Sequence, residues 1–210
     1  MGNRLLVGES KVPRTTAVAV VAAALVSTAG TGVALGQPAI TIEIEEPVLL
    51  PGESTTLTMF AGYGRGDYAV AGLITDLVTS VGSQGWSDAD IVQPMDGPGT
   101  TPGMPSGTGY DGIIAGQLNF PGGAGIYADP TNPIAFWQAT YTAPADVPSP
   151  FEVDLSTMTT RYEVFTASGS SSSESRLDEL IEGAGTITVI PAPASFAVLA
   201  LGVACVRRRR

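Results

Sequence analysis

The sequence predicts an all-β fold, a single antiparallel β-sandwich formed by residues 37–190. Short segments alternate apolar and polar residues, as half-buried strands do. Clusters of glycine, proline, serine and asparagine separate these segments and predict turns. Helical patterns are confined to two short segments. About eight or nine strands result, a number that would also allow a jelly roll.

The first two strands are predicted to follow one another closely. Isoleucines at alternate positions of residues 40–44 predict a half-buried strand that ends at Pro47. A turn at Pro51 and Gly52 leads to a partner strand over residues 54–60. This opening resembles the first hairpin of bacterial immunoglobulin-like and cohesin-like sandwiches, and the resemblance implies that kind of sandwich for the domain.

The next segments predict one long strand and a short helix. Residues 68–81 are apolar and rich in β-branched side chains, and they predict one strand or two strands broken at Gly72. Residues 86–92 predict a short helix, with Ser87 as its N-cap and Asp90 three positions later.

The second half alternates long loops with strands. Residues 93–109 are crowded with proline, glycine, threonine and serine and predict a loop that is long for a compact domain. The last prediction in this half is a helical segment that stops at Gly183. In chain order the predicted elements are a strand at 113–120, a connection at 121–133, strands at 134–141, 151–155 and 162–167, a serine-rich loop at 168–173, helical turns at 175–182 and a strand at 186–190.

Residues 1–36 predict a secretory signal peptide. Basic residues precede a continuous apolar segment over residues 17–26, and Ala34 and Gly36 place small side chains at the positions that a signal peptidase reads. Cleavage after Gly36 would make Gln37 the first residue of the exported chain. A permanent N-terminal anchor helix is the alternative.

Residues 191–210 have three parts in a fixed order. Eleven residues from Phe196 to Val206 form about 16 Å of helix, whereas a bilayer core needs about 30 Å. The segment therefore predicts a short-lived membrane stop whose basic end stays on the cytoplasmic side. The motif residues are Pro191, Ala192 and Pro193, and the basic end is Arg207, Arg208, Arg209 and Arg210.

This order of parts resembles the PEP-CTERM sorting signal of bacterial surface and exopolysaccharide-associated proteins. The resemblance implies an exosortase-type membrane protease as a partner, transient insertion of the tail into the inner membrane, and delivery to the cell envelope or extracellular matrix. Exopolysaccharide is a further implied partner. Ala192 stands where the family has glutamate, so this chain carries a Pro-Ala-Pro variant of the motif.

The predicted domain is strongly acidic. Of the 20 acidic residues in the chain 19 lie in residues 37–190, and of the 10 basic residues only Arg65, Arg161 and Arg176 do, so its net charge is 3 − 19 = −16. Such a surface repels phosphate backbones, which excludes nucleic acid as an expected partner. The chain has no histidine, and its one cysteine, Cys205, lies in the tail. A Ser-His-Asp triad and a zinc site in the domain are therefore excluded.

Two oxygen-rich groups are candidate calcium sites. Asp88, Asp90 and Asp96 lie close together in the sequence, and Asp129 with Asn132 forms a second group. Neither matches an EF-hand loop, and capping and turn chemistry is the alternative explanation. No other cofactor is expected.

Trp137 and Tyr141 are a candidate carbohydrate-binding face. On a strand they share one side and stand roughly 13 Å apart, a separation at which aromatic rings could stack on a sugar chain. The alternative is that both point into the core, which large aromatic residues dominate.

The sequence therefore favours an exported protein of the cell envelope or extracellular matrix, with a structural or adhesive role and no catalytic activity. A carbohydrate-binding module is the second hypothesis. A two-carboxylate glycoside hydrolase is the third and least favoured, because nothing marks which acids would form the pair.

Overall fold

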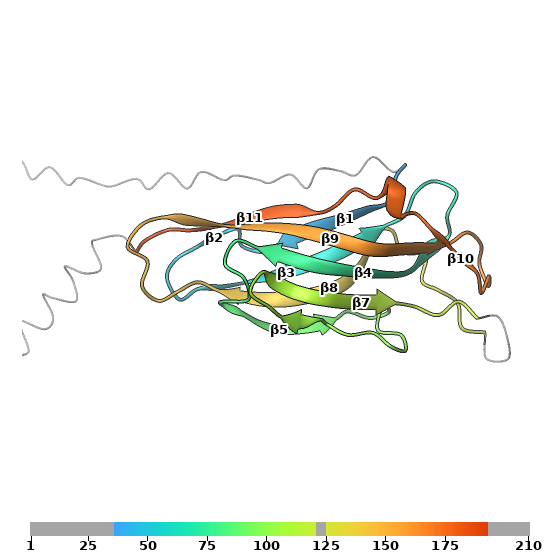
Figure 1. The fold of residues 1–210 in the computed structure, drawn as a ribbon, viewed down its shortest axis with the longest axis horizontal. Coiled ribbons are helices and arrows are strands. Elements are labelled where there is room, and N and C mark those ends of the chain that lie inside the picture. Colours follow the sequence, from blue (N-terminus) through green and yellow to red (C-terminus); the bar gives the residue numbers. More distant parts are fainter. Residues whose placement is uncertain (1–35, 121–124, 193–210) are drawn as a thin grey trace, which may run out of the picture.

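The computed structural model describes residues 36–120 and 125–192, and these form two β-sheets packed face to face (Figure 1). The predicted all-β sandwich is therefore confirmed. The strands are β1 (Ala39–Ile44), β2 (Val48–Leu49), β3 (Ser54–Gly62), β4 (Ala69–Thr79), β5 (Trp86–Ile91), β6 (Met104–Pro105), β7 (Gly109–Gly116), β8 (Ile134–Thr142), β9 (Phe151–Phe165), β10 (Ser173–Ser175) and β11 (Ala184–Val189), with one short 3-10 helix, η1 (Leu177–Glu179).

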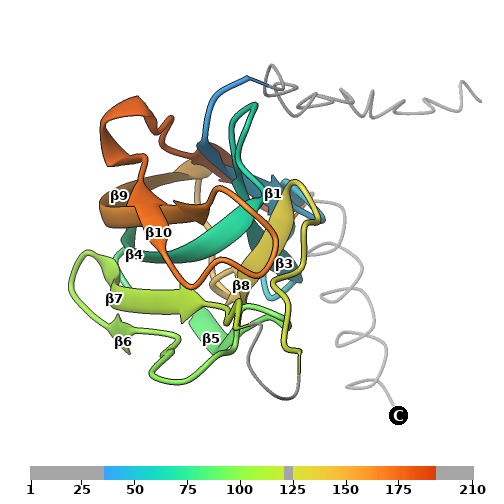
Figure 2. The ribbon, with the colours of Figure 1, turned by 90° about the vertical axis from the view of Figure 1, so that its right-hand side faces the viewer.

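The first sheet has the strand order β1-β3-β8-β5, and the second has the order β2-β11-β9-β4-β7-β6 with β10 added to β9. Figure 2 views the end that carries β10 and shows the two layers side by side. Neighbouring strands run antiparallel, except that the two-residue β2 runs parallel to β11. The core lies between the sheets because the longer strands turn their apolar sides inward, whereas the residues of the short β6 and β10 are exposed.

The segment predicted as a helix at residues 86–92 is a strand, so that prediction was wrong. Trp86 and Ile91 are both buried, although five positions separate them and strict alternation would place them on opposite faces. The register of β5 on β8 shifts between Ser87 and Asp90, and Asp88 takes a positive φ of 53° there. This bulge returns both apolar side chains to the core, and pairing with β8 outweighs the local capping signal.

Two other predicted elements also differ from the structure. The predicted strands at 151–155 and 162–167 are one strand, the 15-residue β9, which runs the length of the sandwich. β4 continues through Gly72 with only a shift of register there, so of the two predicted alternatives the single strand is confirmed. The predicted helical turns at 175–182 shorten to η1. At β9, pairing to β11 and β4 continues where the local sequence suggested a break.

The two ends of the sandwich are marked by β9. At one end Phe151 pairs with Val189, the last residue of β11, and we call this the exit end. At the other end Phe165 pairs with Ala69, and we call this the tip end. At about 3.3 Å per residue the 15 residues of β9 place these ends roughly 46 Å apart. In Figure 1 β2 and the start of β9 lie toward the left and β10 lies at the right.

The predicted processing segments fall largely outside the described residues. This holds for residues 1–35 of the signal segment, which include Ala34, and for Pro193, Phe196, Val206 and the four terminal arginines. Gly36 and Gln37 are exposed just before β1. Among the residues that the structure describes, no helix is long and apolar enough to cross a bilayer.

Candidate functional site

The aromatic pair predicted as a sugar-binding face lies in the core. Trp137 is 0% exposed and Tyr141 is 2% exposed. The Trp137 Nε1 donates a hydrogen bond to the carbonyl of Pro102 at 3.0 Å, and its ring packs edge-on against Tyr110. No platform for a sugar chain exists at these two residues, so that hypothesis is corrected.

A bulge explains why both Trp137 and its neighbour Phe136 are inside. The pairing of β3 with β8 shifts register between Met59 and Phe60, so that Met59 faces Trp137 and Phe60 faces Ala135. Phe136 is the extra residue, and the bend it causes turns two successive side chains inward. Tyr141 then packs against Trp86, with the ring centroids 5.1 Å apart.

The three aspartates predicted as a calcium site do not converge. In the described part of the chain no group of three or more acidic, histidine or cysteine side chains could hold a metal ion. Asp88 accepts a hydrogen bond from Ser87 at 2.9 Å, and Asp90 accepts one from the backbone N–H of Ile91 at 2.9 Å. Asp96 forms a bridge to β7 at Gly116, on a different segment. These residues serve local turn geometry.

Asp129 and Asn132, the second candidate calcium group, form hydrogen bonds with different residues. Hydrogen bonds from the hydroxyl and backbone N–H of Thr131 lower the pKa of the Asp129 carboxyl. The Asn132 side chain accepts from the N–H of Tyr63 and donates to its carbonyl, at 3.1 and 3.0 Å. Asn132 thus fixes the position of the loop after β3.

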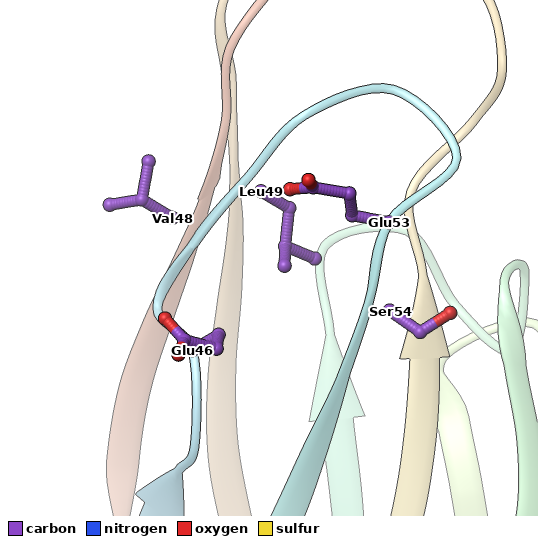
Figure 3. Close-up of a pocket in the computed structure, with 5 residues that line it drawn as sticks. All are labelled: Glu46, Val48, Leu49, Glu53 and Ser54. Carbon is purple, nitrogen blue, oxygen red and sulfur yellow. The ribbon is translucent and has the colours of Figure 1, made fainter.

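A shallow hollow lies at the exit end, lined by Glu46, Val48, Leu49, Glu53 and Ser54 (Figure 3). Val48 is 45% exposed. One oxygen of Glu53 accepts a hydrogen bond from the backbone N–H of Leu50 at 2.8 Å. The hollow adjoins the predicted sorting motif, because the N–H of Ile190, just before Pro191, bonds to the Leu49 carbonyl at 2.9 Å.

The most prominent exposed apolar feature is at the tip end. Four large side chains stand out from the segment between β7 and β8, and we call them the apolar tip. Phe120 and Ile126 face one another across a short antiparallel bridge, in which Phe120 N–H bonds to the Ile126 carbonyl at 2.8 Å. The exposed fractions are Leu118 46%, Phe120 56%, Ile126 49% and Tyr127 58%.

Gln117 holds the base of this segment. Its side-chain amide is buried, donates to the carbonyl of Val70 at 2.6 Å, and accepts from the N–H of Asp129 at 2.8 Å. Through Gln117, these bonds connect the start of the segment to Val70 of β4 and to Asp129 at its end. A buried carboxamide with satisfied hydrogen bonds fixes backbone geometry strongly, because breaking it would leave buried polar groups without partners.

Asn119 fixes the segment to the neighbouring loop. It is 4% exposed, and its Nδ2 donates to the carbonyls of Ala167 and Ser170 at 3.1 and 3.0 Å. Its Oδ1 accepts from the N–H groups of Ala128 and Gly169 at 3.3 and 3.0 Å. All four hydrogen-bonding positions of the amide are used. The apolar tip therefore stands on a rigid polar base.

Ion pairs gather in the half of the sandwich that carries the apolar tip. Arg176 bonds to Asp67 and Glu174, with Nη2 at 2.8 and 3.1 Å from their carboxylates. Arg161 bonds to Glu163 at 2.8 Å, and this raises the pKa of the guanidinium and lowers the pKa of the carboxyl. Carboxylates at this end are therefore partly neutralised.

The sequence patterns did not identify the apolar tip. They assigned residues 113–120 to a strand and 121–133 to a connection, and so treated these side chains as ordinary strand and loop residues. The usable signal was that Phe120, Ile126 and Tyr127 lie on either side of a Pro-Gly-Gly sequence. Large apolar residues in a connection between strands are less often part of the core than those within strands.

No protein-family model matches this sequence, and no curated protein matches it. Comparison with solved structures finds similarity to cohesin modules. One belongs to a family 33 glycoside hydrolase of Clostridium perfringens, with 9% sequence identity and a TM-score of 0.42, covering 75% of this chain and 99% of that chain.

The sixth cohesin of scaffoldin B from Acetivibrio cellulolyticus, solved with a dockerin, has 10% identity and a TM-score of 0.45, covering 74% of this chain and 98% of that chain. A type III cohesin module from a cell-surface anchoring scaffoldin of Ruminococcus flavefaciens has 9% identity and a TM-score of 0.38, with 75% and 89% covered. At these values the similarity concerns the general sandwich arrangement and says nothing of what this chain binds.

Proposed function

We propose that this chain is an exported, non-catalytic module of the cell envelope or extracellular matrix, with an adhesive or structural role. Its C-terminal segment tethers or sorts it, and its apolar tip makes contact away from the tether. Export is supported by the signal and sorting segments found in the sequence. In this proposal the apolar tip is the surface that makes contact.

The observation that carries the proposal is the placement of the two ends. The chain leaves β11 at Val189, beside Phe151, whereas the base of the apolar tip is bonded to Ala167, just beyond Phe165. The length of β9, roughly 46 Å, lies between them. A chain tethered through residues that follow Val189 therefore directs its apolar tip away from the point of attachment.

Two of the described acids are poorly suited to the proton-donating role that hydrolysis requires. A glycosidase of the two-carboxylate type needs an acid whose pKa is raised, so that it can donate a proton. Asp129 and Glu163 have lowered pKa values, because hydrogen bonds from Thr131 and Arg161 stabilise their charged forms. These two carboxyl groups are suited to structural pairing.

Cell fractionation with mass spectrometry tests the proposal. The full chain should reach the envelope or the medium and begin at Gln37, and its released form should lack Arg207 to Arg210. The matched variant replaces the four arginines with glutamine, which removes the positive charge and keeps the apolar segment; it should be sorted less efficiently. Full-length protein with both termini in the cytosol would contradict the proposal.

A further inference from the structure

We propose that cleavage after Gly36 is followed by ring closure of Gln37, so that the exported chain begins with pyroglutamate and residues 37–210 carry no primary amine. This makes residue 37 a modification site. The inference rests on the proposed function, which supplies cleavage at this bond, and it deepens that function by stating what the exported N-terminus becomes.

The composition of the exported chain gives this one amino group its importance. The only lysine of the sequence is Lys11, which belongs to the predicted signal segment, so residues 37–210 contain none. Residues 37–190 also lack histidine and cysteine. The α-amino group that cleavage creates at Gln37 is therefore the sole primary amine of residues 37–210.

Gln37 is exposed, and the fold begins immediately after it. The carbonyl of Pro38 accepts a hydrogen bond from the N–H of Ile181 at 3.0 Å, and the carbonyl of Ile181 accepts one from the N–H of Ile40 at 2.9 Å. Ala39, between the two bonded residues, is 1% exposed. The chain is thus fixed from Pro38 onward, whereas Gln37 itself is open to solvent.

Gly64 lies against the backbone of this first residue. A Cβ placed on Gly64 would be 3.7 Å from the Cα of Gln37 and 3.5 Å from the Cδ of Pro38. The new N-terminus therefore runs along the surface of the domain beside the loop after β3. Ring closure joins only atoms of Gln37, so it requires no change in this packing.

The reaction needs no second molecule. The neutral α-amino nitrogen of Gln37 attacks the side-chain carbon Cδ, and the new N–Cδ bond closes a five-membered lactam. The Cδ–Nε2 bond breaks, and ammonia leaves with one proton from the amine. Both groups belong to one residue, which favours closure. An α-amino group has an ordinary pKa of about 7.7–8.0, so roughly a tenth of it is neutral and nucleophilic at pH 7.

The fold opposes the competing reaction of the same amine. Attack on the carbonyl carbon of Pro38 would close a six-membered ring and split the chain before Ala39. That loss would remove the acceptor of the Ile181 N–H and free the end of β1, where Ala39 is buried and pairs with Gly62. Pyroglutamate formation breaks none of these contacts.

Cyclisation changes the chemistry that the domain offers to its surroundings. It removes the terminal positive charge. It also leaves residues 37–190 without an amine, an imidazole or a thiol. Aldehydes, which include the reducing ends of sugar chains, condense with amines and find none on such a domain.

The test labels primary amines on the exported chain, recovered from the medium or the envelope and denatured before digestion. Because residues 37–210 contain no lysine, the label reports the N-terminus alone. Label per chain should be at least tenfold lower than for Gln37→Asn, whose shorter side chain would need a strained four-membered ring. Tandem mass spectrometry should find the peptide that begins at residue 37 lighter by one ammonia.

A cell-free arm separates ring closure from export. It uses residues 37–210, the predicted exported form, released from a fusion by a protease that cuts directly before Gln37. Label per chain should fall during days of incubation at pH 7 and stay constant for Gln37→Asn.

Two results would overturn the inference. They are an exported chain that begins at Gln37 and carries one label per molecule, and an exported chain that begins at another residue. The first result would refute ring closure and leave the proposed function standing. Full-length protein in the cytosol would refute the proposed function, and ring closure would then be judged from the cell-free arm.

Discussion

Asn119 shows how one buried side chain can hold an exposed surface in place. Its amide group bonds to four backbone groups. Three belong to Ala167, Gly169 and Ser170 in the loop after β9, and the fourth belongs to Ala128. The neighbouring Phe120 is mostly solvent-exposed. A buried residue thus sets the position of exposed residues beside it.

Replacing Asn119 with alanine should lower the free energy of unfolding by about 1–3 kcal/mol, because it leaves buried backbone groups without partners. Denaturant unfolding measures the loss. Amide hydrogen exchange should speed up locally at Ala128 and Gly169, whose N–H groups lose their acceptor. Ser171→Ala, in the same loop, is the control. Unchanged exchange at both amides would contradict this role for Asn119.

At the scale of elements, β9 ties the molecule together. It pairs with β4 and β11 along its length and with β10 at its end. Glu163 is its last charged residue, bonded to Arg161 at 2.8 Å on the same strand and to Ser173 of β10 at 2.7 Å. This carboxylate therefore links the short β10 to the long strand.

Glu163→Gln should make stability less dependent on acid pH. The hydrogen bond from Arg161 lowers the pKa of the folded carboxyl, and Ser173 lowers it further. A lowered folded pKa stabilises the protein above the unfolded value of about 4.3, and the benefit is lost as pH falls through the folded pKa. The unmodified chain should therefore be more stable than the variant at pH 7, and the gap should close in acid.

Urea unfolding at a series of pH values measures this difference. Glu152→Gln is a suitable control, because Glu152 lies on the same strand but faces Thr188 across the sheet. A gap between the unmodified chain and Glu163→Gln that widened as the pH fell would show that the assigned sign is wrong.

At the scale of the whole molecule, uneven charge is the dominant electrostatic feature. The domain carries 19 acids and 3 arginines, and the arginines are gathered at one end. Repulsion among the remaining carboxylates opposes the compact state, most strongly at the exit end. Stability should therefore respond to ionic strength as well as to core packing.

Raising NaCl from about 0.01 M to about 0.15 M shortens the Debye length from about 30 Å to about 8 Å. The melting temperature should rise by roughly 2–4 °C, which corresponds to about 1 kcal/mol for a domain of this size. Calorimetry measures the shift. A double variant with Glu46→Gln and Glu53→Gln should melt higher at low salt and respond less. A melting temperature that falls with salt would contradict this account.

Local patterns were enough to predict the class of fold and many of its strands. Alternation over residues 40–44 anticipated β1, and the long apolar stretch before Val81 anticipated β4. The pattern failed at β5, and on β8 alternation does not account for the burial of both Phe136 and Trp137; the two cases have the same cause. A bulge shifts side-chain alternation by one position, and its location depends on the partner strand.

Composition and residue order, read alone, established an acidic, turn-rich all-β domain without histidine, and they predict processing segments on both sides of it. These properties depend on which residues are present and on their near neighbours. Tertiary structure decided which aromatic residues are buried, how Gln117 and Asn119 anchor the apolar tip, and that the tip lies a full strand length from the chain's exit. Those features depend on pairing between distant segments, which local alternation does not encode.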